Sequence, residues 1–175
     1  MSCRNGAFAL GVRVVAGAGS GPRGAEFHHG YDRPVSPVPE RVAVLVYSNS
    51  PQVRAQVRTA VGRRPAPDVG RIDWVECATQ ADVTRELDDG GIDLAILDGE
   101  AQPTGGLGLA RQLKDEITDC PPIVVSVRRA DDRWLATWSR ADAVLVHPLD
   151  PLTAAETVAD VLRGVEGGNG APVRR

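Results

Sequence analysis

The sequence predicts an α/β domain built on a doubly wound, five-stranded parallel sheet with helices on both faces. From residue 41 onward, short apolar runs alternate regularly with helical segments. Several of these runs are almost continuously apolar, as parallel strands covered on both faces require. Five such strand and helix units fit within about 125 residues, the usual size of one domain. The 175 residues are therefore expected to hold one domain with additional segments at its ends.

The expected elements follow one another in strict alternation. Five apolar runs, each followed by a polar or turn residue, predict strands at residues 42–47, 72–77, 92–97, 123–127 and 143–146. The segments between and after them predict helices at residues 51–61, 80–89, 105–117, 131–140 and 151–163. In the last helix, apolar residues recur at spacings of three and four and predict one buried face, formed by Leu152, Ala155, Val158, Ala159 and Leu162.

Composition divides the chain into three parts. Residues 1–40 contain seven glycines and four prolines, a combined share above the roughly 25% that is typical of low-complexity segments. We therefore expect a flexible tail at 1–40, a domain at 41–164 and a short C-terminal tail at 165–175. A GxGxxG match within residues 19–24 lacks the following helix that would hold a pyrophosphate. The adjacent His28 and His29 have no third ligand nearby and are expected to be loop residues.

Charge and cysteine content exclude several classes of protein. Residues 41–164 carry 14 basic and 19 acidic groups, so no basic stripe is available for nucleic acid. The longest apolar stretches are too short for a membrane span, and a cytoplasmic protein is expected. Cys3, Cys77 and Cys120 are odd in number and far apart, which argues against a disulfide framework or a zinc site.

Polar residues stand directly after the apolar strands, where open α/β sheets place their ligands. Four segments of the chain carry a resemblance to a known family: residues 92–98, an apolar run ending in Asp98; Gly106; residues 122–126, ending in Ser126; and residues 141–148, which contain His147 followed by a proline. In this order and spacing, residues 42–163 resemble the receiver domain of two-component response regulators, a flavodoxin-like family. The resemblance implies the strand order 2-1-3-4-5.

The resemblance also implies roles for the residues at the strand ends. Asp98 corresponds to the phosphoacceptor, and Ser48, Ser126 and His147 are implied members of the phosphoryl pocket. Asn49, Asp98 and Glu100 are the implied ligands of a weak Mg²⁺ site.

Two departures reduce the charge that stabilises a transferring phosphoryl group. Ser48 and Asn49 stand where the family has an acidic pair, and His147 replaces its lysine. On the alternative interpretation, Asp98 is a structural acid that accepts hydrogen bonds from Ser48, Asn49 or Ser126.

The sequence therefore predicts an atypical receiver that is not an enzyme. It is expected to act in a phosphorelay, or independently of phosphorylation, through contacts with a histidine kinase or a regulated enzyme complex; a homodimer is also left open. The eleven residues after residue 164 are too few for a DNA-binding output domain. Two other functions remain as alternatives: a small-molecule or nucleotide binder at the strand ends, and a structural subunit of a larger assembly.

Trp134 and Trp138 lie one helical turn apart on the expected fourth helix. Exposed rings would form a partner surface. Alternatively, at least one ring packs inward and fills a core that is poor in aromatic residues.

Overall fold

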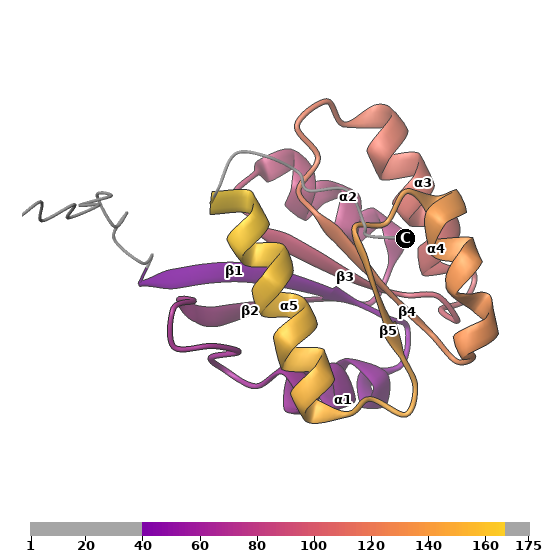
Figure 1. Ribbon diagram of the computed structural model, residues 1–175. Helices are drawn as coiled ribbons and strands as arrows, with labels where there is room; N and C mark the ends of the chain where they lie inside the picture. Colours follow the sequence, from indigo (N-terminus) through magenta and orange to yellow (C-terminus); the bar gives the residue numbers. More distant parts are fainter. Residues whose placement is uncertain (1–39, 167–175) are drawn as a thin grey trace, which may run out of the picture. The chain divides into compact units, whose positions relative to one another are not determined.

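Five parallel strands form the central sheet in the order β2-β1-β3-β4-β5, which confirms the predicted fold class and strand order (Figure 1). The computed structural model describes residues 40–166. The glycine motif, the histidine pair and Cys3 lie outside these residues, as do nearly all of the two expected tails.

The observed elements match the expected ones closely. The strands are β1 (Arg41–Tyr47), β2 (Arg71–Cys77), β3 (Leu94–Asp98), β4 (Ile123–Val127) and β5 (Ala143–Val146). The helices are α1 (Pro51–Val61), α2 (Gln80–Asp89), α3 (Gly106–Glu116), α4 (Arg133–Ser139) and α5 (Pro151–Glu166), and a 3-10 turn, η1 (Ala130–Asp132), precedes α4. Within the described range, none of these helices combines the length and the apolar character that crossing a membrane requires.

The strand predicted at residues 92–97 is displaced in the structure, where β3 begins at Leu94 and ends with Asp98. The cause is Asp93, whose carboxylate accepts a hydrogen bond from the backbone N–H of Ala43 at 2.7 Å. A side-chain acceptor thus replaces a ladder bond at the start of the strand. The later end matters for the site, because it makes Asp98 the last residue of a buried strand.

The core consists of two apolar layers, one on each face of the sheet. On one face, α1 and α5 cover residues such as Val44, Ile96 and Val124. On the other face, α2, α3 and α4 cover Leu45 and Leu97. This arrangement is visible in Figure 1, where α5 crosses one face of the sheet. Both layers consist mainly of aliphatic side chains, as the scarcity of aromatic residues requires.

The predicted face of α5 is wrong at its first position. Leu152 is 70% exposed, whereas Ala154, Val158, Ala159 and Leu162 are buried. The helical period gives the spacing of a buried face but not its direction. Packing against α1 selects the face that begins at Ala154 and leaves Leu152 in solvent.

Candidate functional site

The site lies at the point where strand order reverses. From β1 the chain passes through α1 to β2 on one side, and then through α2 to β3 on the other side of β1. The connections on either side of this point diverge and leave a crevice beyond the carboxyl ends of β1 and β3. Ser48 follows β1 directly and Asp98 ends β3. The topology alone therefore brings these two side chains together.

Asp98 is a buried carboxylate whose two oxygens both accept hydrogen bonds. Its exposed fraction is 7%. Ser48 donates its hydroxyl to Oδ2 at 2.7 Å, and the backbone N–H of Glu100 donates to Oδ1 at 3.0 Å. The Ser126 hydroxyl lies 3.5 Å from Oδ1, a long contact. Buried charges need such partners, so the hydrogen bond from Ser48 fits the structural interpretation of Asp98 as well as the functional one.

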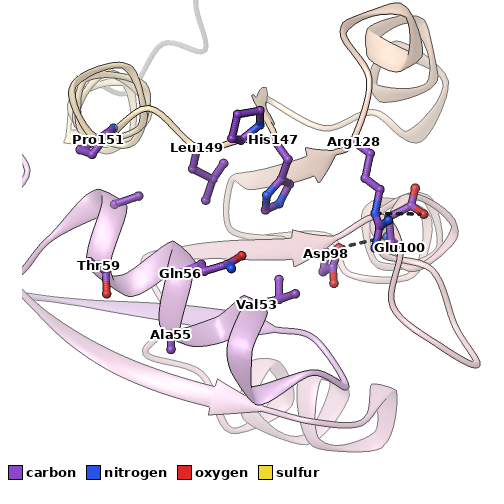
Figure 2. Close-up of a pocket in the computed structure, with 12 residues that line it drawn as sticks. Val53, Ala55, Gln56, Thr59, Asp98, Glu100, Arg128, His147, Leu149 and Pro151 are labelled. Carbon is purple, nitrogen blue, oxygen red and sulfur yellow. Dashed lines mark hydrogen bonds and ion pairs between the residues drawn. The ribbon is translucent and has the colours of Figure 1, made fainter.

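Ser126 and His147 reach the same edge of the sheet from β4 and β5. Ser126 pairs with Asp98 in the β3–β4 ladder and is 1% exposed. His147 follows β5 directly and is partly exposed. Its ring points into a pocket that Asp98 also lines (Figure 2). The volume of this pocket is about 800 Å³. A strand-end pocket with a buried carboxylate and an imidazole is therefore present.

The residues implied as Mg²⁺ ligands do not fit the ion as they are arranged. The Asn49 side-chain oxygen accepts the backbone N–H of Gln102 at 2.9 Å, and the Glu100 carboxylate forms an ion pair with Arg128 at 3.8 Å. Asp98 remains as one carboxylate, with both oxygens already engaged. Within the described part of the chain, no three His, Cys, Asp or Glu side chains gather as they would around a metal. These three residues are therefore not arranged to hold Mg²⁺.

Arg54 is a site residue that the sequence did not reveal. Its guanidinium donates to the carbonyl of Ser48 at 2.6 Å and to the carboxylate of Glu76 at 3.0 Å, with only 14% of the side chain exposed. The hydrogen bond from Arg54 lowers the pKa of Glu76. Arg54 thus fixes the turn that aims Ser48 at Asp98. Its position one turn into α1, facing the end of β2, is the signal that would have identified it.

Tyr47 ties the loop after Asp98 to the end of β1. The ring is 1% exposed, and its hydroxyl donates to the carbonyl of Thr104 at 2.7 Å. The Thr104 hydroxyl in turn donates to Gln80 at 2.9 Å. Burial raises the pKa of Tyr47, and the negative charge of Asp98 raises it further. The phenol therefore stays protonated at neutral pH and keeps its hydrogen bond.

Arg128 also lines the pocket. The Arg128 side chain is 74% exposed. The register of β3 and β4 nevertheless brings it toward Glu100, because each lies two residues beyond the Asp98 and Ser126 pair. A register argument from the two strand ends would have identified Arg128 as a pocket residue.

Both tryptophans of α4 face solvent. Trp134 is 65% exposed and Trp138 is 51% exposed, so the alternative in which one ring packs inward is wrong. Ala136 and Ser139 occupy the buried side of this helix. The Arg111 guanidinium lies 5.9 Å from the centre of the Trp138 ring, within range of a cation–π contact.

Comparisons with known proteins agree with the fold. No family model matches the chain. A protein of Mycobacterium tuberculosis that is named an uncharacterized response regulatory protein is 55% identical over 120 residues, which cover 69% of this chain and 90% of the relative; the match is the same in two strains. Among solved structures, the receiver domain of Francisella response regulator 1452 has a TM-score of 0.58 at 14% identity, covering 70% of this chain and 97% of that one. Response regulator TrrA of Thermotoga maritima, solved in complex with Mg²⁺ and BeF, has a TM-score of 0.56 at 20% identity, covering 69% and 98%.

Proposed function

Because the chain belongs to the response regulator family, we propose that it is an atypical receiver that transmits its signal through protein contacts made by α4. The observation that carries this proposal is the exposed pair of rings, Trp134 and Trp138. Tryptophan is enriched among the residues that dominate binding energy at protein interfaces. Two such rings on one helical face are therefore well suited to anchor a partner such as a histidine kinase or a regulated enzyme complex.

The charge around these rings defines the kind of partner that fits. Residues 128–140 contain four arginines and two aspartates, a net charge of +2, whereas residues 41–164 as a whole carry 14 basic and 19 acidic groups. A basic, aromatic segment on an acidic domain is complementary to an acidic partner surface with an apolar centre. The net negative charge of residues 41–164 supports a protein partner rather than nucleic acid.

The site and this surface are adjacent along the chain. β4 carries Ser126 beside Asp98, and the segment after it leads through η1 directly into α4. One short segment of the chain thus connects Ser126, the neighbour of Asp98, to the helix that carries the tryptophans.

We further propose that Asp98 is the phosphoacceptor. In the reaction with acetyl phosphate, a carboxylate oxygen of Asp98 forms a bond to phosphorus, the bond from phosphorus to the acetate oxygen breaks, and acetate leaves with the electron pair. We propose that the chain catalyses no other turnover. The second candidate, a receiver that works without phosphorylation, is favoured by the hydrogen bonds that already occupy both oxygens of Asp98.

Intact-mass measurement after incubation with acetyl phosphate tests the phosphoacceptor role. The wild-type protein should gain one phosphoryl group, and Asp98→Asn, which keeps the size of the side chain, should gain none. A wild-type protein without any mass change would leave the phosphorylation-independent receiver. Binding to the cognate partner, compared between wild type and the Trp134→Ala, Trp138→Ala double variant, tests the surface separately, and equal affinity would refute its role.

A further inference from the structure

The pocket beside Asp98 contains one cation that is always charged. Its charged or titratable lining residues are Asp98, Glu100, Arg128 and His147. A phosphoryl group carries close to two negative charges at neutral pH, so its transfer and retention require positive charge nearby. A histidine is mostly neutral at pH 7, whereas an arginine is charged at every accessible pH. Arg128 is therefore the dependable source of positive charge among these residues.

Asp98 and Arg128 line the same pocket at the edge of the sheet. Asp98 and Ser126 are paired across β3 and β4, and Arg128 follows the last residue of β4. Its guanidinium lies 3.8 Å from the Glu100 carboxylate, and the backbone N–H of Glu100 donates to Asp98 at 3.0 Å. Figure 2 shows this sequence of contacts from Arg128 through Glu100 to Asp98. One residue, Glu100, thus links the Arg128 guanidinium to the Asp98 carboxylate. The Arg128 backbone directly follows the end of β4.

The contact between Arg128 and Glu100 is easily exchanged. At 3.8 Å it is too long for a hydrogen bond, and exposed pairs of this kind contribute little to stability. In contrast, Arg163 binds Asp68 with two hydrogen bonds of 2.7 and 2.9 Å. Among the residues that the structure describes, the Arg128 guanidinium has no hydrogen bond that it would lose by moving.

We propose that Arg128 is a phosphoryl-binding residue, which leaves Glu100 and pairs with the oxyanion attached to Asp98. It supplies a permanent positive charge, which an imidazole does not. Glu100 competes with the oxyanion for the same guanidinium. The inference rests on the phosphoacceptor role proposed for Asp98, and it adds the residue that recognises the group.

Beryllium fluoride is the probe, because it binds without a chemical transfer step. Its affinity is measured on the full chain by ¹⁹F NMR, with and without Mg²⁺, in the wild-type protein and in Arg128→Gln, Arg128→Lys and Glu100→Gln. Arg129→Gln is the matched control, since it removes the same charge from the adjacent exposed residue. Far-UV circular dichroism confirms that each variant is folded.

Substitution of Arg128 and substitution of Glu100 should have opposite effects on the affinity for beryllium fluoride. Loss of a charged hydrogen bond should weaken binding in Arg128→Gln by about tenfold to a hundredfold, with Arg128→Lys between it and wild type. Glu100→Gln should strengthen binding, and Arg129→Gln should leave it unchanged. Equal affinities for Arg128→Gln and Arg129→Gln would overturn the role of Arg128 alone. A wild-type protein that binds no beryllium fluoride under either condition would overturn the phosphoacceptor role of Asp98 as well.

Discussion

Replacement of Gly106 by alanine should destabilise the domain at the start of α3. A Cβ placed on Gly106 lies 2.5 Å from the carbonyl oxygen of Asp98 and 2.7 Å from its carbonyl carbon. Both are backbone atoms of a buried strand and cannot turn aside as a flexible side chain can. The first turn of α3 must therefore move away from the end of β3, which also disturbs the position of Asp98.

Two opposing contributions set the size of this effect. Overpacking of this kind costs about 1–3 kcal/mol, while alanine regains roughly 0.5–1 kcal/mol over glycine within a helix. The midpoints of these two ranges leave a net loss in the free energy of unfolding of about 1 kcal/mol. Gly108 provides the control, because it lies in the same helix and its Cβ would have no heavy atom within 4 Å. Gly108→Ala should be neutral or gain up to about 1 kcal/mol.

Urea unfolding of the full-length variants, followed by far-UV circular dichroism, measures both effects. The midpoint should fall for Gly106→Ala and hold or rise for Gly108→Ala, with unchanged slopes. A Gly106→Ala protein as stable as the wild type would show that α3 is not held against β3 by this contact.

Three further predictions concern charge, exposure and reactivity. Arg54 lowers the pKa of Glu76 below its ordinary value of 4.5. The ionised Glu76 therefore stabilises the fold fully above about pH 4.5, and this contribution disappears as the pH falls through the lowered value. Glu76→Gln should flatten the loss of stability in acid, and an unchanged dependence of the free energy of unfolding on pH would contradict this. Trp134→Ala should alter the free energy of unfolding by no more than about 0.5 kcal/mol, whereas Trp138→Ala should cost about 0.5–1 kcal/mol because its ring lies 5.9 Å from the Arg111 guanidinium. A loss several times larger in urea unfolding would mean that the rings pack. Burial raises the pKa of Cys77 to about 11, so in a Cys3→Ser, Cys120→Ser background Ellman's reagent at about pH 8 should react with this thiol only after unfolding, and rapid labelling of that native variant would rule out the buried position.

The fold was predictable because parallel strands buried on both faces leave a strong pattern. The strands at residues 123–127 and 143–146 were predicted with their observed bounds. The pattern failed where a side chain replaced the backbone, as at Asp93. It also failed at Leu152 in α5 and left the direction of the α4 tryptophans open, because only tertiary packing chooses a helix face.

The candidate site was predictable in its strand-end residues and not in its arginines. Ser48, Asp98 and Ser126 lie together because strand order and register place them at one edge of the sheet. Arg54 and Arg128 join them through long side chains whose direction depends on neighbours from other elements. A sequence carries little information about the direction of a long side chain, since several rotamers are open to it on the same backbone.

The hydrogen bonding of the loop does not require a neutral residue at position 49. Among the residues that the structure describes, the amide bonds only through its oxygen, as the acceptor of the Gln102 N–H. An aspartate has the same shape and offers the same acceptor oxygen. A single isosteric exchange therefore adds a negative charge next to Asp98 while preserving the loop's hydrogen bond. The fold thus leaves the charge of this corner of the sheet edge open to adjustment, so that one substitution sets how many carboxylates stand beside the strand ends.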